Sequence, residues 1–182
     1  YAPSEDILGN PRPSPSGSNP DIGAYENNNG QLEYNPNKYV SVDGDNNNSG
    51  LITSPYRDIQ HAISQAQNGD IINVAPGTYF ERIDFSGRNI SVIGHSKEST
   101  IIDGGQAGSV VSFTSGETHD AKLQSFTITN GLNSPMSGGI YVNQSSPTLH
   151  DLIISENTGA AGGGICIDNQ CTVVMTNLIV RN

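Results

Sequence analysis

The sequence lacks tryptophan, has few cations and contains no long apolar run. Its 182 residues include four Phe, eight Lys plus Arg and 18 Asp plus Glu, which gives a formal net charge of −10. Eight scattered cations cannot form a basic patch that neutralises phosphates, so we expect no nucleic-acid partner. No apolar run approaches the roughly 20 residues that cross a bilayer, so we expect no membrane insertion.

Apolar residues make up only 34% of the chain and charged residues only 14%, whereas about 25% charged residues is usual for soluble domains. The remaining polarity comes from Asn, Ser, Thr and Gly, which favour turns. This composition excludes a thick two-layer core. It favours short strands that are joined by many turns.

Composition also divides the chain into segments. Six of the ten prolines lie in residues 1–37, whereas residues 38–182 carry nearly all the Val and Ile. The run at 27–37 is rich in Asn, as linkers often are. We therefore predict a tail or closing segment at 1–26, a linker at 27–37 and a folded β-rich region at 38–182.

A repeat of about 26 residues runs through the second half of the folded region. Three eight-residue motifs, at 123–130, 149–156 and 175–182, align at a spacing of 26. Gly-Gly-Ile motifs at 138–142 and 163–167 align at a spacing of 25. The apolar residues alternate with period 2, which indicates short strands with one buried face. Strand units that stack only on their neighbours predict a β-solenoid.

The alignment predicts which residues face the inside of the solenoid. Two apolar columns are expected inside: Phe126, Leu152 and Leu178, and Ile128, Ile154 and Val180. Two polar columns are expected. One lies beside these strands, with Ser125, Asp151 and Asn177, and the other lies at the following turn, with Asn130, Glu156 and Asn182. Such polar columns commonly satisfy turn backbone, so we assign them no catalytic role.

A helix is expected before the strands begin. The spacing of Ile59, Ala62, Ile63 and Ala66 is that of an amphipathic helix, and Ser54-Pro55 has the residues of a helix start. Asn68-Gly69 supplies a stop. The pattern predicts a helix of about 12 residues that covers the apolar end of the first coil.

The runs 39–45, 54–63 and 69–79 resemble the N-terminal cap and first coil of right-handed parallel β-helix proteins of the pectin-lyase-like superfamily. The later repeats are similar to its further coils. The resemblance covers residues 38–182. It implies an all-β, right-handed parallel β-helix with an N-terminal capping α-helix. Residues 20–26 resemble the closing motif at the end of such a module, so residues 1–26 would be the tail of a preceding one.

One metal site is predicted from spacing. Asp43, Asp45 and Asn47 place oxygen ligands at alternate positions, as the first half of a calcium loop does. Asn48 and Ser54 stand where an EF-hand needs Gly and Glu, so an EF-hand is excluded. A weak extracellular Ca²⁺ site and a plain polar turn both fit. We expect that no cofactor is required.

Cys166 and Cys171 leave two alternatives open. They lie five residues apart, so they could form a local disulfide in an oxidising compartment or act as small apolar fillers. The spacing alone does not indicate a zinc site.

Two functions fit the sequence. We find no catalytic constellation, and the last repeat motif reaches Asn182 with no capping sequence, which favours a structural or adhesive module of a larger secreted or cell-surface bacterial protein. Such a module would contact other copies or modules through its solenoid ends and could assemble head to tail. The alternative, implied by the resemblance, is the N-terminal part of a protein that binds or cleaves polysaccharide. An enzyme of this kind would be a polysaccharide lyase.

Overall fold

The computed structural model describes residues 34–133 and 138–181, and the part from Pro36 onward forms one compact unit. The predicted tail at 1–26 and most of the predicted linker lie outside the described residues. Strands dominate the compact unit, and its helix is short. In chain order the elements are β1 (Asn37–Val40), α1 (Ile59–Gln65), β2 (Ile71–Val74), β3 (Gly77–Tyr79), β4 (Ile83–Asp84), β5 (Ser91–Gly94), β6 (Thr100–Asp103), β7 (Val111–Phe113), β8 (Lys122–Thr129), β9 (Leu132–Asn133), β10 (Ile140–Asn143), β11 (Thr148–Ser155), β12 (Thr158–Gly159), β13 (Ile165–Asp168) and β14 (Val174–Arg181).

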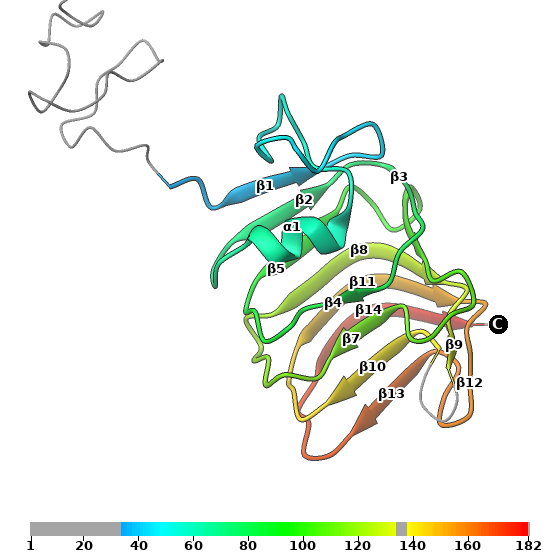
Figure 1. Cartoon of the computed structure of the whole chain (residues 1–182). Coiled ribbons are helices and arrows are strands. Elements are labelled where there is room, and N and C mark those ends of the chain that lie inside the picture. Colours follow the sequence, from blue (N-terminus) through cyan, green and yellow to red (C-terminus); the bar gives the residue numbers. More distant parts are fainter. Residues whose placement is uncertain (1–33, 134–137, 182) are drawn as a thin grey trace, which may run out of the picture. The chain divides into compact units, whose positions relative to one another are not determined.

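Each strand pairs with the strand one coil earlier or later in the chain. The largest sheet has the order β1-β2-β5-β8-β11-β14, and β3 and β6 lie beside this path. A second sheet has the order β4-β7-β10-β13, and β9 pairs with β12. The pairings between these strands are parallel. Figure 1 shows the resulting stack of coils, which confirms the predicted right-handed parallel β-helix.

The register between coils confirms the repeat. Leu152 pairs with Phe126 on one side and with Leu178 on the other, and Ile154 pairs in the same way with Ile128 and Val180. The side chains of Phe126, Leu152 and Ile154 are fully buried. Residues that are 26 positions apart therefore stack directly on one another. Because side chains alternate between the two faces of a strand, the same positions face inward in each of these coils.

The polar column of Ser125, Asp151 and Asn177 lies where each long strand bends. Ser125, Asp151 and Asn177 have φ angles of 61°, 52° and 54°, in the left-handed region that Asn and Asp tolerate better than most residues. Each of these residues bends an eight-residue strand in the middle. One half of β8 can therefore pair with β5 and the other half with β6.

The paired glycines lie where neighbouring coils approach closely. A Cβ atom on Gly139 would lie 2.2 Å from the carbonyl oxygen of Gly164, and one on Gly138 would lie 2.3 Å from that of Thr158. Such contacts are too short for any side chain. The Gly-Gly-Ile motif thus marks close backbone contact between coils.

Helix α1 covers the core at the β1 end of the solenoid, which we call the capped end. Ile59, Ala62 and Ile63 are buried in the core, as predicted. The predicted start and length were wrong, because α1 begins at Ile59 with Asp58 as its N-cap and has 7 residues. Ser54 instead forms an antiparallel bridge with Leu51, which ties it into the preceding loop. Within residues 34–133 and 138–181, no helix has the length and apolar character needed to span a membrane.

The opposite end, called the open end here, is formed by β13 and β14. Five large apolar side chains there are substantially exposed: Ile167, Val174, Met175, Ile179 and Val180. The strand edge of β14 has no further strand beside it in the described part of the chain.

Candidate functional site

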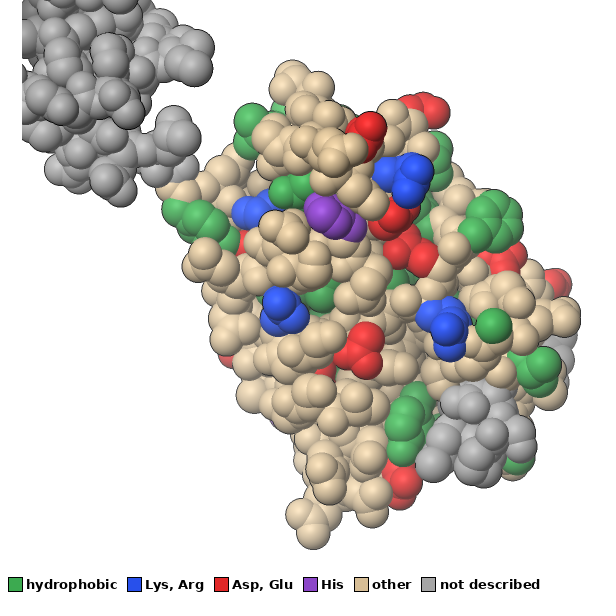
Figure 2. All heavy atoms as spheres, in the orientation of Figure 1, with side chains coloured by type: hydrophobic (Ala, Val, Ile, Leu, Met, Phe, Trp, Pro, Cys, Tyr) green, Lys and Arg blue, Asp and Glu red, His purple; other side chains and the backbone are tan. Residues whose placement is uncertain are grey.

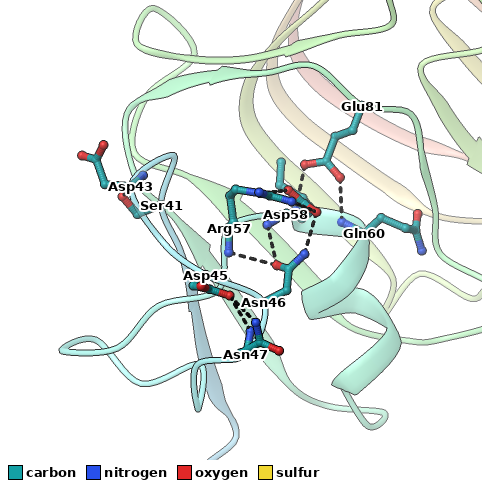
Figure 3. Close-up of polar contacts among 10 residues, drawn as sticks. Ser41, Asp43, Asp45, Asn46, Asn47, Arg57, Asp58, Gln60 and Glu81 are labelled. Atoms are coloured by element: carbon teal, nitrogen blue, oxygen red, sulfur yellow. Dashed lines mark hydrogen bonds and ion pairs between the residues drawn. The ribbon is translucent and has the colours of Figure 1, made fainter.

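The predicted calcium ligands lie in the loop between β1 and α1 (Figure 3). Asp45 Oδ1 accepts hydrogen bonds from the backbone N and the Nδ2 of Asn47, each at 2.9 Å. The carboxylate of Asp43 points away from Asp45 in Figure 3. The structure therefore brings Asp45 and Asn47 together and leaves Asp43 apart. The calcium site stays a prediction.

A denser polar network ties this loop to the start of α1. Asn46 Nδ2 donates to Asp58 Oδ2 at 2.6 Å, and Arg57 Nε donates to Asp58 Oδ1 at 2.9 Å. The carboxylate of Glu81 accepts the amides of Ile59 and Gln60 at 2.8 and 2.9 Å. Figure 3 shows these groups converging on the first turn of the helix.

The two carboxylates of this network have opposite pKa shifts. The hydrogen bond from Arg57 lowers the pKa of Asp58, whereas burial raises the pKa of Glu81. Such opposed shifts occur in acid–base pairs. Here the partners of both carboxylates are already in place, and they hold the loop against the helix. Sequence reasoning missed Glu81, because it lies about one coil after the amides that it caps.

Glu117 joins the turns of three successive coils. Its carboxylate accepts the amides of Gly87 and Ser115 at 2.8 and 2.9 Å and the hydroxyl of Ser145 at 2.7 Å. Burial alone would raise the pKa of Glu117, but these hydrogen bonds outweigh burial and lower it. The Glu117 side chain is buried and its carboxylate is bonded within the protein, so its role is to hold the turns together.

A cation reaches the polar column on the outer face of the largest sheet. Lys97 Nζ lies 2.6 Å from Asp151 Oδ1, and the same carboxylate accepts the Ser125 hydroxyl at 3.2 Å and the side-chain amide of Asn177. Lys97 lies in the turn 95–99, which joins β5 to β6. In the later coils a single residue with a positive φ, such as Asp151, stands at the corresponding position. The hydrogen bond from Lys97 lowers the pKa of Asp151.

Next to this cluster, six outward-facing residues form one column along the largest sheet, which we call the outer strip. The register places one residue per coil in this order: Tyr39, Asn73, Ile93, Gln124, His150 and Thr176. Neighbouring members are about 4.8 Å apart, the spacing of strands in a sheet. The face of the molecule drawn in Figure 2 is also mostly uncharged, with only scattered Lys, Arg, Asp and Glu side chains.

At the capped end the outer strip borders a groove of about 460 Å³, which we call the outer groove. Apolar side chains line most of it: Tyr39, Ile52, Pro55, Pro76 and Ile93. Ser41, Asn73 and His95 add polar groups. Its lining includes no Asp, Glu, Lys or Arg among the described residues. An apolar wall with a few polar groups is the usual composition of a ligand site.

Two larger hollows of about 720 Å³ each lie elsewhere, over the turns around Glu117 and beside α1. Polar residues line most of the first, and the Arg57–Asp58 pair and Glu81 line the second. Their charged side chains are already bonded to other groups of the protein. The outer groove is therefore the better candidate site. In the described part of the chain, no three His, Cys, Asp or Glu side chains are grouped so that they could hold a metal.

Cys166 and Cys171 are free thiols in this structure. Cys171 Sγ donates to the carbonyl oxygen of Asp168 at 2.7 Å, and its side chain packs against the core. Cys166 lies beside Tyr141 in the β10–β13 pairing.

Comparisons with known proteins agree with the fold. A family described as protein of unknown function (DUF1565) matches residues 42–85, the capped end and first coil. No curated protein matches the sequence. The pectin methylesterase PemA from Erwinia chrysanthemi is similar in structure, with 16% identity and a TM-score of 0.54 over 84% of this chain and 55% of that one.

Two further solved structures are similar. A pectin methylesterase mutant in complex with hexasaccharide IV has 14% identity and a TM-score of 0.54, over 84% of this chain and 55% of that one. A pectin methylesterase in complex with hexasaccharide VII has 16% identity and a TM-score of 0.52, over 80% of this chain and 46% of that one. This chain therefore spans about half the length of these structures. Together with the stacked parallel coils, they show that the chain has the right-handed parallel β-helix fold of pectin-lyase-like proteins.

Proposed function

We propose that this chain binds a polysaccharide along the outer strip, with the outer groove as the main contact. The observation that carries the proposal is the composition of the groove: one aromatic ring, two prolines and two isoleucines beside three polar side chains. Sugars present apolar C–H faces as well as hydroxyl groups, so such a surface suits them.

The geometry of the strip supports this proposal. One residue projects from each coil, and the coils are about 4.8 Å apart, close to the length of one sugar residue in an extended chain. The similar pectin methylesterases, two of them in complex with hexasaccharides, support a polysaccharide as the class of ligand.

The site favours binding over cleavage. A general acid at neutral pH needs a raised pKa, whereas Lys97 lowers the pKa of Asp151. The partners of Asp151 also occupy both of its carboxylate oxygens. A β-helix that binds polysaccharide without cleaving it would serve as an adhesive or structural module outside the cell or on its surface.

Affinity electrophoresis on a panel of polysaccharides tests the proposal. We expect at least one polysaccharide to retard the full chain and the Tyr39→Ala variant to lose that retardation. Phe80→Ala is the matched control, because Phe80 is 80% exposed and lies outside the groove. Unretarded migration in every gel would contradict the proposal.

We also propose that the open end binds another β-helix coil, from a second copy or another module. The exposed apolar side chains of β14 and its unpaired edge favour this contact, since such edges accept further strands. We expect concentration-dependent association in analytical ultracentrifugation that Val180→Lys reduces. A monomer at every concentration would contradict it.

A further inference from the structure

We infer that the outer groove selects uncharged sugar residues and rejects free uronates, so that the ligand is a neutral polysaccharide. This inference rests on the proposed function and specifies its ligand. It comes from the distribution of charge around the groove.

The described lining of the groove offers no Lys or Arg partner for a carboxylate. The part of its lining that the structure describes contains no Lys or Arg, and a carboxylate that leaves water without a cationic partner keeps much of its desolvation cost. Lys97 is close in sequence to His95 of the groove, but its ammonium group is paired with Asp151 at 2.6 Å. The positive charge of Lys97 is therefore already balanced by the carboxylate of Asp151.

Other cations are also engaged away from the groove. Lys38 lies 3.4 Å from Asp70, and Arg57 lies 2.9 Å from Asp58. Arg88 donates to the carbonyl oxygens of Ala66 and Ser64. The chain as a whole carries a formal charge of −10, which repels a polyanion as it approaches.

For a neutral sugar, by contrast, the groove offers matching groups. The ring of Tyr39 and the prolines can pack against C–H faces, and Ser41, Asn73 and His95 can bond hydroxyl groups. The backbone of Tyr39 is fixed, because its amide donates to the carbonyl of Gly50 and its carbonyl accepts from the amide of Tyr56, both at 2.9 Å. A preformed wall of this kind costs little to order on binding.

A calcium bridge does not change this preference. To bridge a uronate, a Ca²⁺ ion would need protein carboxylates at the groove, and its lining contains none among the described residues. We therefore expect Ca²⁺ to leave ligand binding unchanged.

Isothermal titration of the full chain tests the inference with two probes of matched length, a galactan oligosaccharide and an oligogalacturonate. We expect the galactan to bind with little dependence on salt or Ca²⁺. The oligogalacturonate should bind at least about tenfold more weakly, a difference of about 1.4 kcal/mol.

A gain of function sharpens the test. Ile52 is 70% exposed, so Ile52→Lys should fold normally and place a cation at the groove. We expect this variant to gain oligogalacturonate binding at low salt and to lose it at high salt. Phe80→Lys adds the same charge outside the groove and should gain nothing.

The outcomes separate the two claims. Equal or tighter binding of oligogalacturonate by the wild-type chain would overturn the inference and leave the proposed function standing. Binding of neither these probes nor any polysaccharide of the panel would overturn the proposed function itself. An equal gain in Ile52→Lys and Phe80→Lys would show that overall charge, and not the groove, decides the preference.

Discussion

The same inward-facing columns run from the capped end to the open end of the solenoid, but their residues are buried at the capped end and partly exposed at the open end. Leu149 is fully buried, whereas Met175, one coil later in the same column, is 45% exposed. Ile154 is likewise buried, and Val180 is 55% exposed. At the capped end, α1 keeps Ile72 of the first coil fully buried.

This comparison shows that an inward-facing apolar residue is buried only where a further coil or a cap covers it, whatever its residue type. Each coil contacts only its neighbours. The capped end carries irregular connections, and these build the outer groove. The open end presents a strand edge and exposed apolar side chains.

The largest expected effect is a difference in stability between alanine variants of two leucines of one column. Leu152→Ala removes a fully buried side chain and should lower the free energy of unfolding by about 2–5 kcal/mol. Leu178→Ala removes a partly exposed one and should cost about 1 kcal/mol or less. Urea denaturation of both variants measures the difference. Equal losses would mean that the open end is covered in solution.

The paired glycines provide a second comparison. Gly139→Ala would press a Cβ atom against the backbone of Gly164, so we expect a loss of about 1–3 kcal/mol. Gly164→Ala would meet Val180 Cγ1 at 2.6 Å, and this exposed side chain can move aside. Thermal unfolding should therefore show a smaller decrease in Tm for Gly164→Ala. The reverse order would contradict the close coil contact.

Glu117 supplies a prediction with a defined pH dependence. Its folded-state pKa is lowered from the ordinary 4.5, so its contribution to stability is present above pH 4.5 and is lost as the pH falls through the folded-state pKa. Glu117→Gln should cost about 1–3 kcal/mol near neutral pH and flatten the acid limb of the stability curve. Glu98→Gln changes an exposed residue and should leave the curve unchanged. An unaltered acid limb in Glu117→Gln would refute the assignment.

The smallest expected effect concerns calcium at the capped end. A weak site at Asp43, Asp45 and Asn47 would raise the free energy of unfolding by only about 1 kcal/mol at five times the Kd. Thermal unfolding with added Ca²⁺ should show a small rise in Tm that Asp45→Ala abolishes and Asp120→Ala preserves. No rise, or an equal rise in Asp45→Ala, would exclude the site.

The regular coils were predictable from sequence because stacking repeats the same physical environment every 26 residues. The spacing of 26 residues alone predicted that Phe126, Leu152 and Leu178 form one column. The capped end lacks that repetition: Ser54 resembles a helix start, yet it pairs with Leu51, and α1 begins at Ile59. The spacing of Ile59, Ala62 and Ile63 predicted the buried face of that helix but not its first residue.

The outer groove and the buried carboxylates escaped prediction for a related reason. Tyr39, Ile52 and Ile93 come from three separate segments that meet only when the coils stack. Glu117 bonds Gly87 and Ser145, which lie about 30 residues to either side. Neither arrangement has a signal within one strand or turn.

The central claim is that a neutral polysaccharide binds in the outer groove at the capped end. Amide chemical shifts measured by NMR during titration with a galactan oligosaccharide test it most directly. We expect changes at Tyr39, Ser41, Asn73 and His95 and none along β14. Changes confined to β13 and β14, or to the turns around Glu117, would contradict the account.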